Sequence, residues 1–195
     1  MRSRAIYGCA GASLSAAEKS FFRETRPWGF ILFARNIGEP AQVQALVAEL
    51  RDTIGDGVTP ILTDQEGGRV ARLKPPHWRE RPPAARFGEL YAQDQERGRD
   101  ACYLNARLIA HDLASLGITV DCLPVLDVPI PGAHDVIGDR AFARDPATII
   151  ALGKAQIEGL IDGGVLPVMK HIPGHGRAGS DSHLALPRVS AKPEE

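Results

Sequence analysis

The segment Asp64-Gln65-Glu66-Gly67-Gly68-Arg69-Val70 comes directly after the apolar run Pro60-Ile61-Leu62-Thr63. An apolar run that ends in polar residues and paired glycines is typical of a buried strand followed by a ligand-binding loop. Before the run, apolar residues recur at helical spacing between Pro40 and Gly55. Proline favours the first turn of a helix and glycine its end, so the sequence predicts a helix that leads into a strand.

This order of helix, glycine and strand recurs along the chain. Apolar runs at 6–10, 29–33, 60–63, 118–126 and 165–169 predict five strands. Helices are predicted at 40–54, 101–116 and 149–161, and the proline-rich segment 74–99 is predicted to be a surface loop that leads into a helix. Alternating strands and helices indicate an α/β fold with a parallel sheet. The apolar residues at helical spacing are Leu104, Leu108, Ile109 and Leu113 in the second of these helices, and Ile149, Ile150, Leu152, Ile157, Leu160 and Ile161 in the third.

Polar residues follow four of the predicted strands. They are Arg35-Asn36, Asp64, Asp127 and Lys170-His171. In a (β/α)8 barrel all strand ends meet at one mouth, whereas an open doubly wound sheet brings together only those near its switch point. No Gly-x-Gly-x-x-Gly follows a strand, which argues against dinucleotide binding. The sequence therefore predicts the N-terminal portion of a (β/α)8 TIM barrel, with about five of its eight βα units.

Composition narrows the class of protein. The chain has 195 residues, a net charge of −1 and 44% hydrophobic residues, which is typical of a globular domain and not of a nucleic-acid-binding protein. No apolar run reaches the ~20 residues that cross a bilayer. The three cysteines contain no Cys-x-x-Cys pair, so we expect reduced thiols and a cytoplasmic location, with no membrane or nucleic-acid partner.

Two loops carry side chains suited to binding a sugar. Asp64 and Arg72 lie eight positions apart and can grip vicinal hydroxyls from two sides. In the segment Gly138-Asp139-Arg140, Arg140 is a candidate ligand clamp whose guanidinium Asp139 would fix. Alternatively, Asp139 and Arg140 form a structural ion pair.

The densest polar cluster runs from Lys170 to His183. His171 and His175 have the spacing of a helical zinc site, but Pro173 and Gly174 between them exclude a helix. A metal-dependent hydrolase that uses His171, His175 and His183 remains one alternative. Acid–base chemistry is favoured, since Asp181 lies two residues from His183 and can orient its imidazole.

Taken together, these motifs resemble the bacterial β-N-acetylglucosaminidases of glycoside hydrolase family 3. The resemblance rests on 29–33, 64–70, 138–140, 170–176 and 181–183, in that order. It implies a TIM barrel, a retaining mechanism, no metal or organic cofactor, and an enzyme that is a monomer when complete. It is strongest for cytoplasmic enzymes that remove terminal β-linked N-acetylglucosamine from muropeptides in peptidoglycan recycling. The implied substrate-binding residues are Asp64, Arg72, Arg140, Lys170 and His171, and the implied catalytic residues are the general acid/base His183 and its partner Asp181.

The sequence departs from this family in one respect. The family's nucleophile is an aspartate in a motif beyond the His183 loop, and nothing after Pro187 resembles that motif. We therefore expect residues 1–195 to form a family 3 N-terminal domain truncated at its C-terminus, and inactive alone. The alternative is a non-catalytic remnant that binds N-acetylglucosamine.

Overall fold

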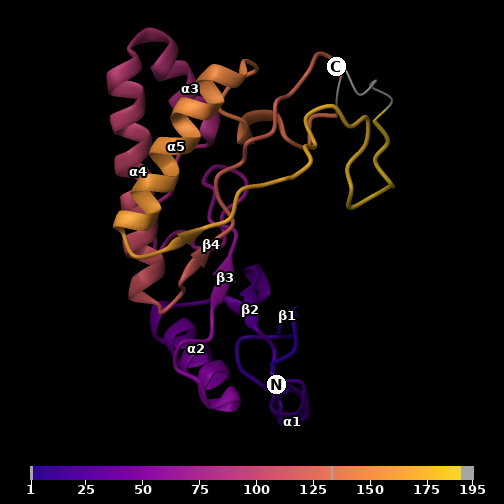
Figure 1. Cartoon of the computed structure of the whole chain (residues 1–195). Coiled ribbons are helices and arrows are strands. Elements are labelled where there is room, and N and C mark those ends of the chain that lie inside the picture. Colours follow the sequence, from indigo (N-terminus) through magenta and orange to yellow (C-terminus); the bar gives the residue numbers. More distant parts are fainter. Residues whose placement is uncertain (1, 133, 190–195) are drawn as a thin grey trace.

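The computed structural model describes residues 2–132 and 134–189. Residues 190–195, which belong to the segment searched for the nucleophile motif, lie outside this description. The described chain forms one five-stranded sheet that curves from β1 at one end to β5 at the other (Figure 1). The strands are β1 (Ile6–Tyr7), β2 (Gly29–Leu32), β3 (Ile61–Thr63), β4 (Val120–Asp121) and β5 (Leu166–Pro167).

All four strand pairings are parallel, and the strands follow one another in chain order, β1-β2-β3-β4-β5. This order separates the two architectures that fit an alternating pattern. A doubly wound sheet reverses its strand order at a switch point, whereas a barrel adds each strand beside the last. The described residues therefore have the topology of five consecutive units of a (β/α)8 barrel, as the sequence predicted.

Helices connect the strands and cover the outer side of the sheet. They are α1 (Ala16–Thr25), α2 (Pro40–Ile54), α3 (Ala84–Gln93), α4 (Gln95–Ser115) and α5 (Pro146–Asp162), with short 3-10 helices at Ala34–Asn36 and Gly138–Arg140. The predicted end of α2 is confirmed, because Gly55 adopts a left-handed conformation with φ of 70°. Helix α4 begins earlier than predicted, since the Asp94 side chain accepts a hydrogen bond from the Arg97 amide at 3.1 Å.

The strands are shorter than the apolar runs that predicted them. The run 118–126 contains Pro124, which has no N–H to donate, and regular pairing stops at Asp121. The backbone nevertheless stays beside its neighbour, because Leu126 donates to the Lys170 carbonyl and Lys170 donates to that of Pro124. The polar residues after the strands are thus delivered to one edge of the sheet.

The core is apolar, and the predicted helix faces are confirmed in part. Ile109, Leu113, Ile149, Leu152 and Leu160 are buried, whereas Leu104 and Leu108 are about half exposed and Ile150 and Ile161 are also exposed. A Cβ at Gly159 of α5 would collide with the Tyr103 carbonyl oxygen and with Ala106, so α4 and α5 approach closely through small residues. The buried face of α4 is consequently Cys102, Ala106, Ile109, Ala110 and Leu113.

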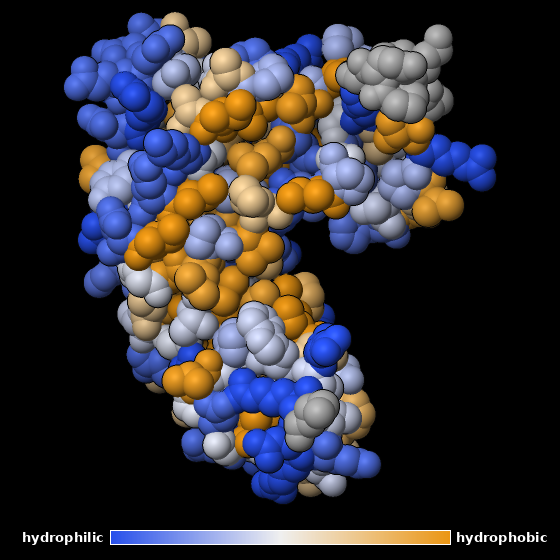
Figure 2. All heavy atoms as spheres, viewed as in Figure 1, coloured by the Kyte–Doolittle hydropathy of each residue, from blue (hydrophilic) through white to orange (hydrophobic). Residues whose placement is uncertain are grey.

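A further apolar surface runs along the middle of the face shown in Figure 2. Its exposed apolar side chains at β5 include Leu166, Val168 and Met169. Among the described residues, no helix has the length and hydropathy to cross a membrane.

Candidate active site

Three charged side chains meet where β3 and β5 end. Asp64 follows β3 directly, and its Oδ1 accepts a hydrogen bond from the Lys170 ammonium at 2.8 Å. Its Oδ2 accepts a second from the Arg72 guanidinium at 3.1 Å. Because β3 and β5 flank β4 in a parallel sheet, their C-terminal ends face the same mouth. The structure thus brings Asp64, Arg72 and Lys170 together at this mouth.

Glu66 extends this group toward the loop after β4. Its carboxylate accepts two hydrogen bonds from the Arg140 guanidinium, of 2.8 and 2.9 Å. The Lys170 ammonium lies 2.6 Å from the same carboxylate. The Glu66 side chain is only 4% exposed. Glu66 belongs to the motif 64–70, but no role was predicted for it from the sequence. Its position two residues after Asp64 in the same loop was the signal that could have identified it.

We call the five side chains Arg72, Asp64, Lys170, Glu66 and Arg140 the charged cluster. Burial opposes ionisation of Asp64, but Lys170 and Arg72 hold its pKa below the usual value. Burial likewise opposes the charge on Lys170, and the carboxylates of Glu66 and Asp64 raise its pKa above the usual value. Both groups are therefore charged at neutral pH. The cluster offers a carboxylate acceptor between two cationic donors, an arrangement that fits neighbouring hydroxyls of a sugar.

His171 joins the cluster through Arg140. Its Nε2 lies 3.2 Å from Arg140, and its Nδ1 lies 2.6 Å from the Asp127 carboxylate. If Nδ1 carries the proton and donates to Asp127, Nε2 is free to accept from the guanidinium. Asp127 also accepts from the His175 amide. Although burial opposes its ionisation, the bonds from His171 and His175 keep the Asp127 pKa below its usual value.

Asp181 and His183 form a separate pair on an exposed loop. Asp181 Oδ1 lies 2.7 Å from His183 Nδ1 and also accepts from the His183 amide at 2.9 Å. These contacts lower the pKa of Asp181. The His183 side chain is 82% exposed, and the hydrogen bonds of the described residues do not join this pair to the charged cluster. The structure thus contains the predicted Asp181–His183 contact without placing it against the cluster.

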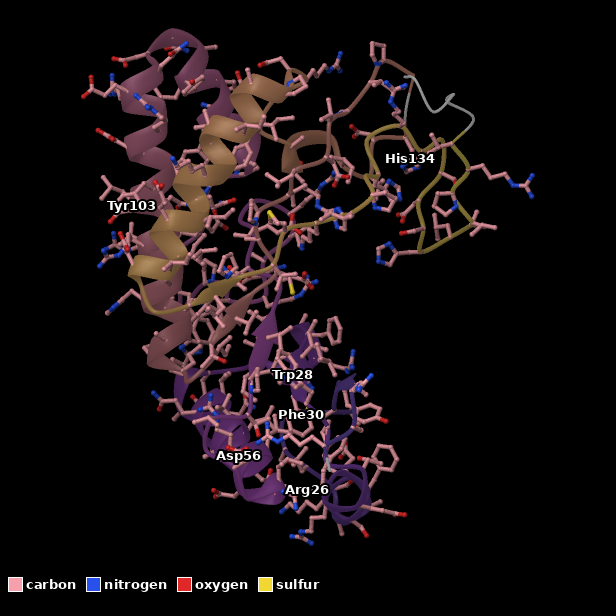
Figure 3. The ribbon with its side chains drawn as sticks, in the orientation of Figure 1. Arg26, Trp28, Phe30, Asp56, Tyr103 and His134 are labelled. Atoms are coloured by element: carbon pink, nitrogen blue, oxygen red, sulfur yellow. The ribbon has the colours of Figure 1, made fainter. Side chains whose placement is uncertain are left out.

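The loop that carries this pair is held from one side. His134 donates its amide to the Ala178 carbonyl at 3.0 Å, and Ile130 donates to Gly176 at 3.1 Å. Figure 3 shows His134 beside the C-terminal loop. A Cβ at Gly176 would collide with the Val128 carbonyl oxygen, so glycine is required for this close approach. The segment after β4 therefore holds the beginning of the loop that carries Asp181 and His183.

One expectation for the loops is wrong. Asp139 neither holds the Arg140 guanidinium nor forms an ion pair with Arg140; it pairs with Arg69 at 3.2 Å, and Glu66 holds Arg140 instead. Arg35 and Asn36 follow β2, and both donate side-chain hydrogen bonds of 3.0 Å to the Cys9 carbonyl.

The histidines do not form the metal site considered from the sequence. Within residues 2–132 and 134–189, no group of three or more His, Cys, Asp or Glu is arranged to hold a metal ion. The rings of His171 and His175 lie 6.4 Å apart between centroids.

Comparison with known proteins identifies the family. The model of the glycosyl hydrolase family 3 N-terminal domain matches residues 11–195. The chain belongs to glycosyl hydrolase family 3. A curated β-hexosaminidase from Methylococcus capsulatus is 40% identical over 190 residues, which are 97% of this chain and 55% of that protein. The chain thus spans about half the length of the curated relatives it matches.

Solved structures of family 3 members have the same fold. NagZ from Neisseria gonorrhoeae, in complex with N-trifluoroacetyl-D-glucosamine, superposes with a TM-score of 0.88 at 33% identity, covering 95% of this chain and 54% of NagZ. A family 3 β-N-acetylglucosaminidase from Paenibacillus superposes with a TM-score of 0.86 at 35% identity, covering 97% of this chain and 35% of that protein. These similarities confirm the predicted family and its TIM-barrel-like domain.

Proposed function

We propose that this chain supplies the saccharide-binding part and the general acid/base of a β-N-acetylhexosaminidase. The observation that carries this proposal is the charged cluster, in which Asp64 stands between the donors Arg72 and Lys170. A neutral sugar has vicinal hydroxyls that both donate and accept hydrogen bonds, so this alternation suits it. The similarity to NagZ bound to an N-acylated glucosamine derivative supports an N-acetylglucosamine unit as the ligand.

His183 is the proposed general acid/base. Asp181, 2.7 Å from Nδ1, orients the ring, so that Nε2 can donate a proton to the leaving glycosidic oxygen. The same nitrogen can then accept a proton from the water that releases the sugar. For this step the exposed loop must bring His183 over the bound sugar. The His183 side chain is 82% exposed, so packing against the described residues does little to oppose this movement.

A retaining mechanism also needs a carboxylate nucleophile about 5–5.5 Å from the acid/base. The described carboxylates at the mouth already have partners: Asp64 and Glu66 are paired with cations, and Asp127 is bonded to His171. We therefore infer that residues 1–195 bind the saccharide and do not turn it over alone. A non-catalytic remnant that binds N-acetylglucosamine would behave in the same way. The two hypotheses differ in whether a longer chain is active.

The proposal extends to the setting of the reaction. We infer that the substrate is a muropeptide whose terminal β-linked N-acetylglucosamine is removed in peptidoglycan recycling, and that the complete enzyme is a cytoplasmic monomer. Three free thiols support a reducing compartment.

Calorimetry of N-acetylglucosamine with the 195-residue chain tests binding. Asp64→Asn should weaken it at least about tenfold, since a hydrogen bond to a charged group contributes about 1.5–3 kcal/mol. Asp52→Asn, an exposed change on α2, is the matched control and should bind like wild type. Absence of wild-type binding would refute the proposal.

Turnover is measured as nitrophenol release from a β-N-acetylglucosaminide. We expect none from residues 1–195, and release from a longer chain that carries the family's aspartate motif beyond the His183 loop. In that longer chain His183→Ala should slow release about 10²–10⁴-fold. An unchanged rate would refute the role of His183, and an inactive longer chain that still binds sugar would favour the remnant.

A further inference from the structure

A third carboxyl group lies close to the two carboxylates of the charged cluster. Asp121 ends β4 and is fully buried, with 0% of its surface exposed. The sheet register places it opposite Thr63 on one side and Pro167 on the other. Its two neighbouring strands are thus those that deliver Asp64 and Lys170 to the mouth. Asp121 belongs neither to the charged cluster nor to the Asp181–His183 pair.

One oxygen of Asp121 fixes the backbone of the binding loop. Its Oδ1 accepts a hydrogen bond from the Gln65 amide at 2.9 Å. Gln65 lies between Asp64 and Glu66 in the chain, so this bond holds the peptide from which both cluster carboxylates project. Replacement of Asp121 by asparagine would keep an acceptor for this bond, whereas alanine would remove it.

The other oxygen has no partner. Asp121 Oδ2 is buried and makes no hydrogen bond with any described residue. A carboxylate in this position loses its hydration without compensation, so the neutral acid is favoured. Burial raises the Asp121 pKa to about 7, with the Gln65 amide and Lys170 opposing the shift and Asp64 and Glu66 adding to it. Both protonation states therefore occur near neutral pH.

The charges that face Asp121 determine what its ionisation does. They are Lys170 from the β5 side and Asp64 and Glu66 from the β3 side. The adjacent Cys122 is neutral, because burial raises the pKa of its thiol to about 11. With Asp121 neutral, the single ammonium of Lys170 serves two carboxylates. With Asp121 ionised, a third buried carboxylate interacts with the same ammonium, which then serves three carboxylates.

We propose that Asp121 is a positioning residue of the saccharide site, which binds sugar best while Asp121 is neutral. This inference rests on the proposed function, because the bound ligand is a sugar held by Asp64 and Lys170. It adds that the site contains its own pH-dependent element below the binding surface. A role in folding alone would not make sugar affinity depend on the protonation of this residue.

The test combines a ligand-free and a ligand-bound measurement on the whole chain. Carbon-13 NMR follows the aspartate carboxyl signals from pH 5 to pH 9, and the signal missing in Asp121→Asn identifies Asp121. Calorimetry then measures the Kd of N-acetylglucosamine at pH 6 and pH 8 for wild type, Asp121→Asn, Asp121→Ala and the surface control Asp52→Asn. Histidines titrate in the same range, so the wild-type profile alone assigns nothing.

We expect the Asp121 signal to titrate between pH 6 and pH 8 and its midpoint to rise when sugar is bound. The wild-type and Asp52→Asn Kd values should increase at least about threefold from pH 6 to pH 8, which corresponds to half a pKa unit of coupling. Asp121→Asn should bind at both pH values like wild type at pH 6. Asp121→Ala should bind more weakly at both, and if it does not fold, the comparison with Asp121→Asn still decides.

Two results would overturn the inference: an Asp121 signal that does not titrate between pH 5 and pH 9, or an Asp121→Asn chain that keeps the wild-type dependence on pH. A wild-type chain that binds no sugar at any pH would overturn the proposed function and this role together. The ligand-free titration distinguishes that outcome from failure of the inference alone, because it reports the ionisation of Asp121 without sugar.

Discussion

Replacing Glu66 with glutamine tests the charged cluster most directly. The change keeps the volume of the side chain and removes the charge that faces Arg140 and Lys170, whose side chains are only 12% and 13% exposed. Removing one partner of a buried ion pair costs about 3–5 kcal/mol. In this variant Lys170 still donates a hydrogen bond to Asp64, and Arg140 still donates one to the Val136 carbonyl at 3.2 Å. We therefore expect a loss of unfolding free energy at the lower end of this range, about 3 kcal/mol.

Urea denaturation of the 195-residue chain measures this loss. With a denaturant slope of about 2–3 kcal/mol per molar, 3 kcal/mol lowers the midpoint by about 1 M. Glu89→Gln is the matched control, because its pair with Arg86 is 56–67% exposed and should contribute less than about 1 kcal/mol. A Glu66→Gln midpoint equal to that of Glu89→Gln would refute the view that buried charge pairing holds the mouth together.

Three further predictions concern other parts of the fold. Asp64 and Asp127 have lowered pKa values, so they stabilise the folded chain above about pH 4, and the free energy of unfolding should fall as the pH drops below that value, measured by urea titration at pH 6, 4 and 3. Asp145→Ala removes the side chain that caps α5 at 2.8 Å and should lower the thermal midpoint. Gly176→Ala should expose its loop to proteolysis sooner than wild type, because a Cβ there collides with the Val128 carbonyl; equal cleavage rates would contradict this packing.

The sequence predicted the strand-end residues well because parallel topology alone brings them together. Asp64 and Lys170 lie 106 positions apart and still form a hydrogen bond, since each directly follows its strand. Glu66 was not assigned a partner in this way, because Arg140 comes from the short 3-10 helix Gly138–Arg140 after β4, and strand order does not determine how that helix is oriented. The same segment explains the wrong partner given to Asp139, which pairs with Arg69.

The apolar faces of the helices were predicted in part. Helical spacing of large apolar residues selected Ile109 and Leu113, which are buried, together with Leu104 and Leu108, which are exposed. The packed face is lined in part by small residues, and Ala106 allows the backbone of α5 to approach at Gly159. Which face of α4 packs against α5 depends on how the side chains of the two helices fit together. The periodicity of one helix alone does not determine this.

The order of strands along the chain also determines when the binding site is formed during folding. The bond between Asp64 and Lys170 spans 106 residues, and the pair between Glu66 and Arg140 spans 74. Contacts of such long range form only after the intervening loops have closed, so the site is absent until β5 pairs with β4. On the ribosome, sugar affinity would therefore arise only after residue 170 has left the exit tunnel. Binding of the proposed sugar ligand can therefore be measured as an indicator that all five strands have formed.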